Sequence, residues 1–262
     1  KIKNNMDALI QCFSSIDLTT LNATDTMERG RTFAENVNRF AALYPQMPSV
    51  AAICVYPALV PAVRQALKVP GVRIAAVGGG FPASQTYSSV KAAECAQCVE
   101  NGADEVDIVI SLNHFLSGNY EEAGREIAMV RKALGEKAHL KVILETGVLK
   151  TKDAIIKASF LAMENGADFI KTSTGKLEPA ATPFAAEVMC CCIRDFYQHT
   201  GKRIGFKPAG GITVASEALE YRSIVREVLG DEWLTPSLFR IGASRLANNL
   251  LKDIFQEDLA LF

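Results

Sequence analysis

The chain has 262 residues, of which 49% are hydrophobic and 22% charged, a balance typical of an ordinary globular protein. Its net charge is −1 and it has no long basic or acidic run, which argues against nucleic acid or an anionic membrane as partner. No apolar run reaches the length of a membrane span, the opening residues lack a signal-peptide core, and seven cysteines without framework spacing favour the reducing cytoplasm.

In chain order, a short helical segment at 6–11 is followed by strands that alternate with helices. The strands are short and apolar, and the helices carry apolar residues at helical spacing. The predicted strands are 12–18, 50–55, 72–77, 105–110, 140–144, 169–176, 203–206 and 238–241. The predicted helices are 25–44, 58–68, 86–101, 120–134, 151–165, 182–199, 215–229 and 244–255. Asp25 with Glu28 predicts a capping box at the first of these helices, and Thr151 and Thr182 are predicted caps of two others.

This alternation predicts the fold. Strands that are apolar throughout, with helices between them, indicate a parallel sheet covered on its outer face. Eight such units in a chain of this length predict a single (β/α)8 TIM barrel over residues 1–262, with a short N-terminal helical extension. A doubly wound open sheet is the alternative. No linker or low-complexity stretch divides the chain.

A lysine lies inside the apolar part of the stretch 169–176. Lysine is rarely buried without a partner or a function, and burial lowers its pKa, which makes the amine a nucleophile near neutral pH. Lys171 is therefore a candidate for Schiff-base chemistry on a carbonyl. The alternative is a strand-end lysine that extends to water.

An internal repeat places an aspartate beside this lysine. Glu100-Asn-Gly-Ala-Asp104-Glu-Val-Asp107 is repeated as Glu164-Asn-Gly-Ala-Asp168-Phe-Ile-Lys171, two βα units later. Alternate strands of a barrel contribute to one interior layer, so Asp107 and Lys171 are predicted to point inward together. Lys207 ends the neighbouring strand and should lower the pKa of Lys171, while Asp107 can transfer protons. A purely structural ion-pair network is the alternative.

The loops after the seventh and eighth strands are candidates for phosphate binding. They contain Gly210-Gly211 and Gly242-Ala243-Ser244, and Ser244 opens a helix whose N-terminus attracts anions. Gly175-Lys176 could add a cation from the sixth loop. The alternative is that these glycines only make tight turns.

No metal or other cofactor is expected. The three histidines are scattered, and the mid-helix cysteines lack metal-ligand spacing. These cysteines are Cys95-x-x-Cys98 and Cys190 to Cys192.

Two lysine motifs, Phe169-Ile-Lys-Thr-Ser-Thr-Gly-Lys176 and Gly205-Phe-Lys-Pro-Ala-Gly-Gly211, resemble those of the deoxyribose-phosphate aldolase family. The resemblance extends from about residue 17 to 244. It implies a metal-free class I aldolase that cleaves 2-deoxy-D-ribose 5-phosphate reversibly to acetaldehyde and D-glyceraldehyde 3-phosphate. It also implies Lys171 as the Schiff-base lysine, with Asp107 and Lys207 as the proton-transfer pair.

Residues expected to bind substrate or phosphate are Asp17, Thr174, Gly175, Lys176, Gly210, Gly211, Gly242, Ser244 and Arg245. Thr213 stands where many family members have an arginine, so Arg245 is predicted to supply the missing positive charge. The partners implied are a small phosphosugar and aldehydes, in a homodimer or a tetramer. Two alternatives are a Schiff-base aldolase with another acceptor and a catalytically inactive phosphosugar-binding protein.

Overall fold

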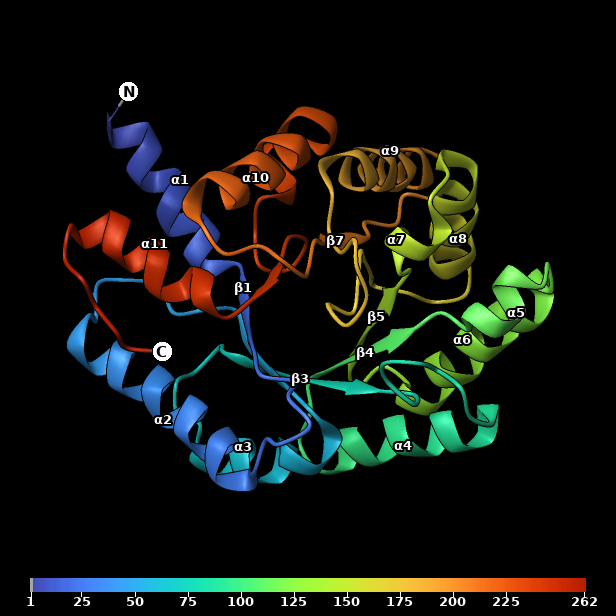
Figure 1. Cartoon of the computed structure of the whole chain (residues 1–262), viewed down its shortest axis with the longest axis horizontal. Helices are drawn as coiled ribbons and strands as arrows, with labels where there is room; N and C mark the ends of the chain where they lie inside the picture. The colour runs from blue at the N-terminus through green and yellow to red at the C-terminus, as the bar shows by residue number, and fades with distance from the viewer. Residues whose placement is uncertain (1) are drawn as a thin grey trace.

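The computed structural model describes residues 2–262 and contains an eight-stranded parallel barrel surrounded by helices (Figure 1). The strand order β7-β6-β5-β4-β3-β2-β1-β8 follows the chain around the barrel, as in a (β/α)8 TIM barrel. The strands are β1 Ile16–Thr19, β2 Ala52–Val55, β3 Arg73–Gly78, β4 Glu105–Val109, β5 His139–Ile143, β6 Phe169–Lys171, β7 Gly205–Lys207 and β8 Ile241–Ala243. The predicted fold class is therefore confirmed, and the open-sheet alternative is wrong.

The barrel closes between β7 and β8 through irregular backbone pairing. The amide of Phe206 donates to the carbonyl of Leu238 at 2.9 Å, and the amide of Arg240 donates to the carbonyl of Phe206 at 3.1 Å. Closer to the carboxyl ends of these two strands, the amide of Gly242 donates to the carbonyl of Pro208 at 2.9 Å. These bonds satisfy the edges that a parallel sheet would otherwise expose.

Helices cover the outside of the barrel, and α1 precedes the first strand as the predicted N-terminal extension. They are α1 Ile2–Ser14, α2 Met27–Leu43, α3 Val60–Ala66, α4 Ser88–Glu100, α5 Leu112–Leu116, α6 Tyr120–Leu134, α7 Thr146–Leu149, α8 Lys152–Glu164, α9 Pro183–Thr200, α10 Ala215–Leu229 and α11 Arg245–Phe255, with 3-10 turns Pro57–Leu59 and Asp231–Trp233. No helix in this described part of the chain is both long and apolar enough to cross a membrane.

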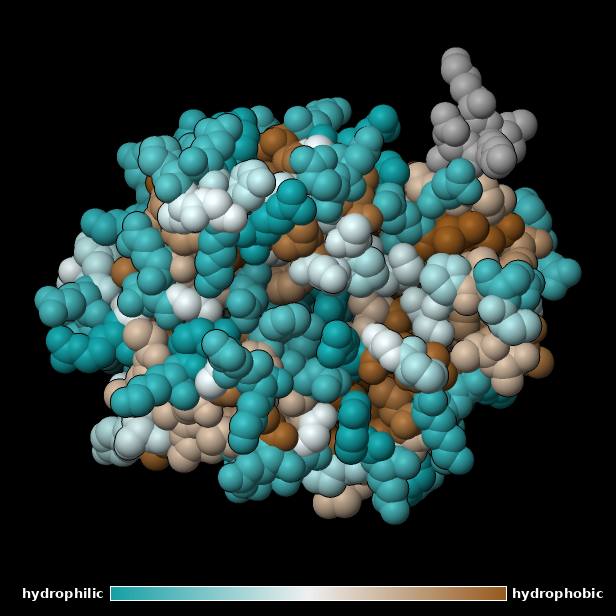
Figure 2. Space-filling model, turned by 180° about the vertical axis from the view of Figure 1, so that it is seen from behind, coloured by the Kyte–Doolittle hydropathy of each residue, from teal (hydrophilic) through white to brown (hydrophobic). Residues whose placement is uncertain are grey.

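Alternation along the strands separates two kinds of interior. Outward residues such as Ile53, Val106 and Ile170 pack against the helices in one large apolar core. Inward residues of β2 and β3 form a second, small cluster. The inward residues of most other strands are charged and lie in the barrel centre. On the face seen in Figure 2, apolar surface is broken into patches by hydrophilic side chains.

Several element boundaries differ from the sequence prediction. Residues 12–14 continue α1, and the first strand begins only at Ile16. The N-cap of α2 is Thr26, which accepts from the Arg29 amide at 3.2 Å, so the predicted capping box of Asp25 is wrong. The Asp25 carboxylate instead accepts from the Thr20 hydroxyl at 2.7 Å. The last strand lies at Ile241–Ala243 rather than 238–241, and α5 and α7 were not predicted.

Candidate active site

Three strands place the predicted catalytic side chains at one level. Lys171 ends β6 and Lys207 ends β7, and the two residues are paired in the parallel register. Asp107 lies in β4. Gly205, on β7, makes room below them, because a Cβ there would lie 2.3 Å from the Phe169 ring. The ring of Phe169 thus packs across the barrel floor beneath the lysines.

The carboxylate of Asp107 connects three amines. Its Oδ2 accepts from Lys171 Nζ at 3.1 Å and from Lys207 Nζ at 2.9 Å. Its Oδ1 accepts from Lys141 Nζ at 2.8 Å. Asp107, Lys141 and Lys207 have no exposed surface, and Lys171 is 3% exposed. The structure thus brings the predicted trio into direct contact and adds Lys141 to it.

A second layer of charge lies deeper in the barrel. Lys207 Nζ also contacts Asp17 Oδ2 at 2.5 Å, and Arg240 contacts the other oxygen of Asp17 at 2.8 Å. The same guanidinium makes two bonds to Glu105, of 2.8 and 2.7 Å. Bidentate pairing of this kind fixes both groups in one orientation.

Sequence reasoning did not assign a role to Lys141, Glu105 or Arg240. One signal was available, because Lys141 and Glu105 are charged residues in apolar strands. Both share the inward parity of the predicted residues: Glu105 is two positions before Asp107, and Lys141 is opposite Asp107 in the strand register. Charge at an inward position of a barrel strand indicates a partner across the interior.

The surroundings set the protonation of the two lysines in opposite directions. Burial, followed by the positive charge of Lys207, lowers the pKa of Lys171 below that of a free lysine, against the opposing pull of Asp107. Burial would also lower the pKa of Lys207, but Asp107 and Asp17 outweigh it and raise that pKa. Lys171 is therefore the amine that loses its proton more readily.

Asp107 remains an anion in this setting. Burial alone would raise its pKa, but the ammonium groups of Lys141, Lys207 and Lys171 hold the pKa of this carboxyl well below its usual range. As an anion bonded to three amines, this carboxylate can accept a proton but has none of its own to supply.

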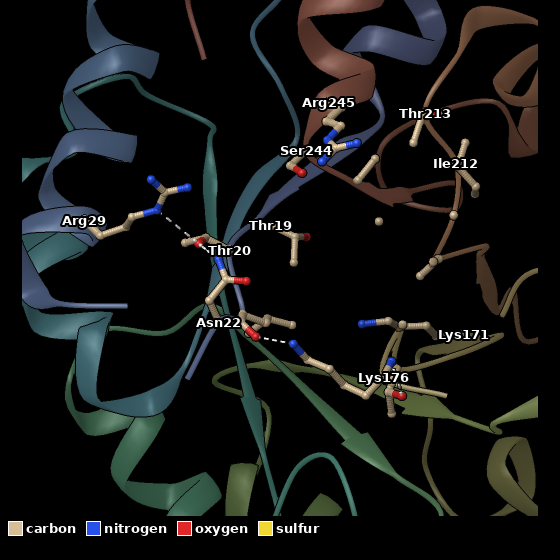
Figure 3. Close-up of a pocket in the computed structure, with 18 residues that line it drawn as sticks. Thr19, Thr20, Asn22, Arg29, Lys171, Lys176, Ile212, Thr213, Ser244 and Arg245 are labelled. Atoms are coloured by element: carbon tan, nitrogen blue, oxygen red, sulfur yellow. Dashed lines mark hydrogen bonds between the residues drawn. The ribbon is translucent and has the colours of Figure 1, made fainter. Parts of the chain in front are cut away.

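A cavity of about 310 Å3 opens above the network, at the carboxyl ends of the strands (Figure 3). Lys171 points into it from β6, and its walls come from the loops after β1, β6, β7 and β8. The predicted residues on its wall are Lys171, Thr174, Gly175, Lys176, Gly210, Gly211, Gly242, Ser244 and Arg245. Asp107 and Lys207 lie beneath it. Asp17, predicted to bind substrate, lies there too, within the ion network.

One end of this cavity has the features of an anion site. Gly210 and Gly211 take φ values of +91° and +78°, a conformation that glycine adopts without strain. Ser244 and Arg245 begin α11, whose free amides attract negative charge. Both side chains, with Thr213, lie at this end in Figure 3.

The opposite wall is tied together across the barrel mouth. The Lys176 ammonium donates to the carbonyl of Leu21, in the loop after β1. Thr174 is held in place by Glu145, which accepts from both its amide and its hydroxyl, at 3.1 and 2.7 Å.

Sequence reasoning missed Arg29, which lies on the cavity wall. Its side chain comes from α2, and no motif in the sequence pointed to it. Within residues 2–262, no group of histidine, cysteine and carboxylate side chains has the geometry of a metal site.

A TIM barrel with a deprotonatable lysine at the carboxyl ends of its strands has the architecture of a lysine-dependent aldolase. The comparison with protein families agrees: the model of the DeoC/LacD family aldolases matches residues 12–233. The chain therefore belongs to this family.

Known relatives extend over almost all of the chain. It is 45% identical to deoxyribose-phosphate aldolase of Mus musculus, an alignment that covers 94% of this chain and 80% of that protein. The apo-form structure of a Toxoplasma gondii protein superimposes with a TM-score of 0.84 at 23% identity, and covers 98% of this chain and 100% of its own. A tetrameric deoxyribose phosphate aldolase from Aeropyrum pernix has a TM-score of 0.72 at 23% identity, over 99% and 100% of the two chains. The two structures support the fold.

Proposed function

We propose that this protein cleaves 2-deoxy-D-ribose 5-phosphate reversibly to acetaldehyde and D-glyceraldehyde 3-phosphate through a Schiff base on Lys171. The observation that carries the proposal is a buried lysine of lowered pKa that faces a cavity and contacts Asp107 at 3.1 Å. The name of the 45% identical mouse relative supports the substrate.

The reaction starts at the aldehyde carbon C1 of the open-chain sugar. The neutral amine of Lys171 adds to C1, and loss of water leaves a protonated imine. As a base removes the proton of the C3 hydroxyl, the C2–C3 bond breaks and its electron pair moves into the imine, which becomes an enamine. Glyceraldehyde 3-phosphate leaves. Protonation of the enamine at C2 and addition of water then release acetaldehyde and restore the Lys171 amine.

The proton-transfer roles fall to Asp107 and Lys207. Both oxygens of Asp107 are bonded to amines and lie below the cavity, so we assign its contact with the C3 hydroxyl to an intervening water. Lys207, which contacts the same oxygen as Lys171, supplies and recovers protons and disfavours positive charge on its neighbour.

We assign the phosphate to the end of the cavity formed by Gly210, Gly211, Gly242, Ser244 and Arg245. The backbone amides there and the start of α11 suit an anion, and Arg245 adds a positive charge where Thr213 has none. Gly175 and Lys176 contribute the facing wall. In the network below, we assign Asp17 to holding Lys207, which it contacts at 2.5 Å.

A related aldolase with another acceptor is the second candidate, since the family model covers both DeoC and LacD aldolases. With acetaldehyde as donor, comparing D-glyceraldehyde 3-phosphate with other aldehydes as acceptor separates the two. A binding protein without activity would have lost a motif lysine, and this chain has both Lys171 and Lys207.

We further propose that the protein is a cytoplasmic homodimer or tetramer, on the strength of the resemblance alone. Sedimentation velocity measures its oligomeric state.

Borohydride trapping tests the function directly. Incubation with deoxyribose 5-phosphate and borohydride should attach the reduced adduct to the peptide that contains Lys171, as mapped by mass spectrometry. An adduct on Lys207 or Lys141 would contradict the assignment. The same trapping after treatment with EDTA should be undiminished, and activity that depends on added zinc would place the protein among metal-dependent aldolases.

A further inference from the structure

The barrel interior contains an unequal number of opposite charges. Within residues 2–262, seven buried side chains form one continuous set of ion pairs. Four are basic and three acidic: Lys141, Lys171, Lys207 and Arg240, with Asp17, Glu105 and Asp107. If all seven were ionised, one positive charge would lie in the interior without compensation, which costs several kcal/mol. The set is therefore electrically balanced when one basic group is neutral.

The contacts identify which group that is. Among the described residues, Lys141 reaches all three carboxylates, at 2.8, 2.9 and 3.4 Å. Lys207 and Arg240 each reach two. Lys171 reaches one, Asp107 at 3.1 Å, and shares that oxygen with the closer Lys207. Lys171 is the least compensated of the four, and the cavity gives its proton a route to solvent.

We propose that Glu105 and Arg240, at the opposite end of the barrel interior from the cavity, are positioning residues that set the protonation of Lys171 through this charge balance: Arg240 favours the neutral amine, and Glu105 opposes it. Glu105 begins β4 and Arg240 immediately precedes β8, so both lie at the amino ends of the strands. Side chains at that face usually contribute to stability alone. Here they are joined to Lys171 through Asp17, Lys207 and Asp107.

Other titratable groups near this set leave the balance unchanged. Burial raises the pKa of the Cys54 thiol, on β2, so it remains uncharged near neutral pH. The Glu145 carboxylate, after β5, makes no ion pair with the seven described side chains of this set; it accepts instead from the amide and hydroxyl of Thr174. His139 Nδ1 lies 3.6 Å from Glu105, but its side chain is half exposed, so it does not belong to the buried set. Lys176 and Arg245 are on the cavity wall, and Lys176 is bonded to the Leu21 carbonyl.

The test changes the balance at the far end and measures the effect at Lys171. Glu105→Gln removes a negative charge, so the pKa of Lys171 should fall. Arg240→Met removes a positive charge, so that pKa should rise. The double variant restores the balance. Each single shift should be about one pH unit, the order expected for a unit charge acting across a barrel interior at an effective dielectric constant of about 20.

The readout is the pH dependence of adduct formation on Lys171 with acetaldehyde and borohydride. The acidic limb should move down in Glu105→Gln, up in Arg240→Met, and return to the wild-type position in the double variant. Arg131→Met is the matched control: it breaks the Arg131–Asp168 ion pair of 2.6 Å, which is partly exposed and outside the interior set, and should leave the limb unchanged.

The inference rests on the proposed role of Lys171, and the experiment separates the two. Absence of a Lys171 adduct in the wild type overturns the proposed function. An adduct in all variants with the same acidic limb overturns the charge-balance inference alone. If a single variant is too unstable to titrate, melting temperatures provide the test: the double variant should melt above that single variant. A double variant that melts below both single variants shows independent structural roles and overturns the inference.

Discussion

The two sides of the barrel interior differ sharply in chemistry. On the β2–β3 side, Cys54, Ala75 and Val77 form an apolar cluster with Leu21, against which Tyr56 and Phe81 pack. On the other side, β1 and β4 to β7, with Arg240 just before β8, supply the buried charges around Asp107. Burial is the largest cause of the lowered pKa of Lys171, and Lys207 is the second. The comparison indicates that the apolar side excludes water while the charged side determines which amine is free.

The largest expected effect comes from the charged side. Lys171→Leu removes the nucleophile and keeps an apolar side chain in a site that is only 3% exposed. We expect activity to fall by about 10⁴-fold or more, since covalent chemistry has no substitute in the cavity. Borohydride should then give no substrate adduct on the chain. A variant that retains activity within tenfold would show that the covalent step occurs elsewhere.

The second-largest effect distinguishes two roles of Lys207: its charge lowers the pKa of Lys171, and its ammonium group transfers protons. Lys207→Leu removes the second cause of the lowered Lys171 pKa, so that pKa should rise and the acidic limb of kcat/KM should move to higher pH. Activity near neutral pH should fall by more than about tenfold, the range for loss of a positioned acid–base group. If the limb stays in place while activity falls, Lys207 acts only in proton transfer. If neither changes, the paired-lysine mechanism is wrong.

The sequence predicted the fold and the centre of the site for a physical reason. Strand and helix periodicity are local, and the repeat around Asp107 and Lys171 gave both residues the same inward parity. The partners of Arg240 could not be predicted in this way, because Asp17 and Glu105 are 223 and 135 positions away in the chain. The predicted last strand, 238–241, also differed from β8, so the residues that face the interior there were not identified. The balance among these buried charges depends on contacts between distant segments, which form only when the barrel closes.

A substitution on the apolar side should change the stability of the fold and leave the pKa of Lys171 unchanged. Val77→Ala removes two methyl groups from a fully buried position and should destabilise the fold by about 1–2.5 kcal/mol, through lost burial and a residual cavity. Urea unfolding measures this change. Val77 makes no ion pair, so the acidic limb of kcat/KM should remain within about 0.3 pH units of wild type. A larger shift would mean that water enters the cluster and that the two sides are not separate in function.

The smallest effect is expected from a charge at the cavity mouth, which belongs to neither side of the barrel interior. Arg245 is exposed at the cavity mouth, where solvent screens its interaction with a phosphate, unlike the buried pairs below it. Arg245→Ala should raise KM for deoxyribose 5-phosphate about two- to fivefold, with kcat nearly unchanged. For unphosphorylated deoxyribose KM should not change, because that substrate has no phosphate to bind. Equal increases for both substrates would mean that Arg245 shapes the mouth without contacting phosphate. A much larger increase for the phosphorylated substrate would show that the bound state excludes water at the mouth, so that a charge exposed in the free enzyme acts there like a buried one.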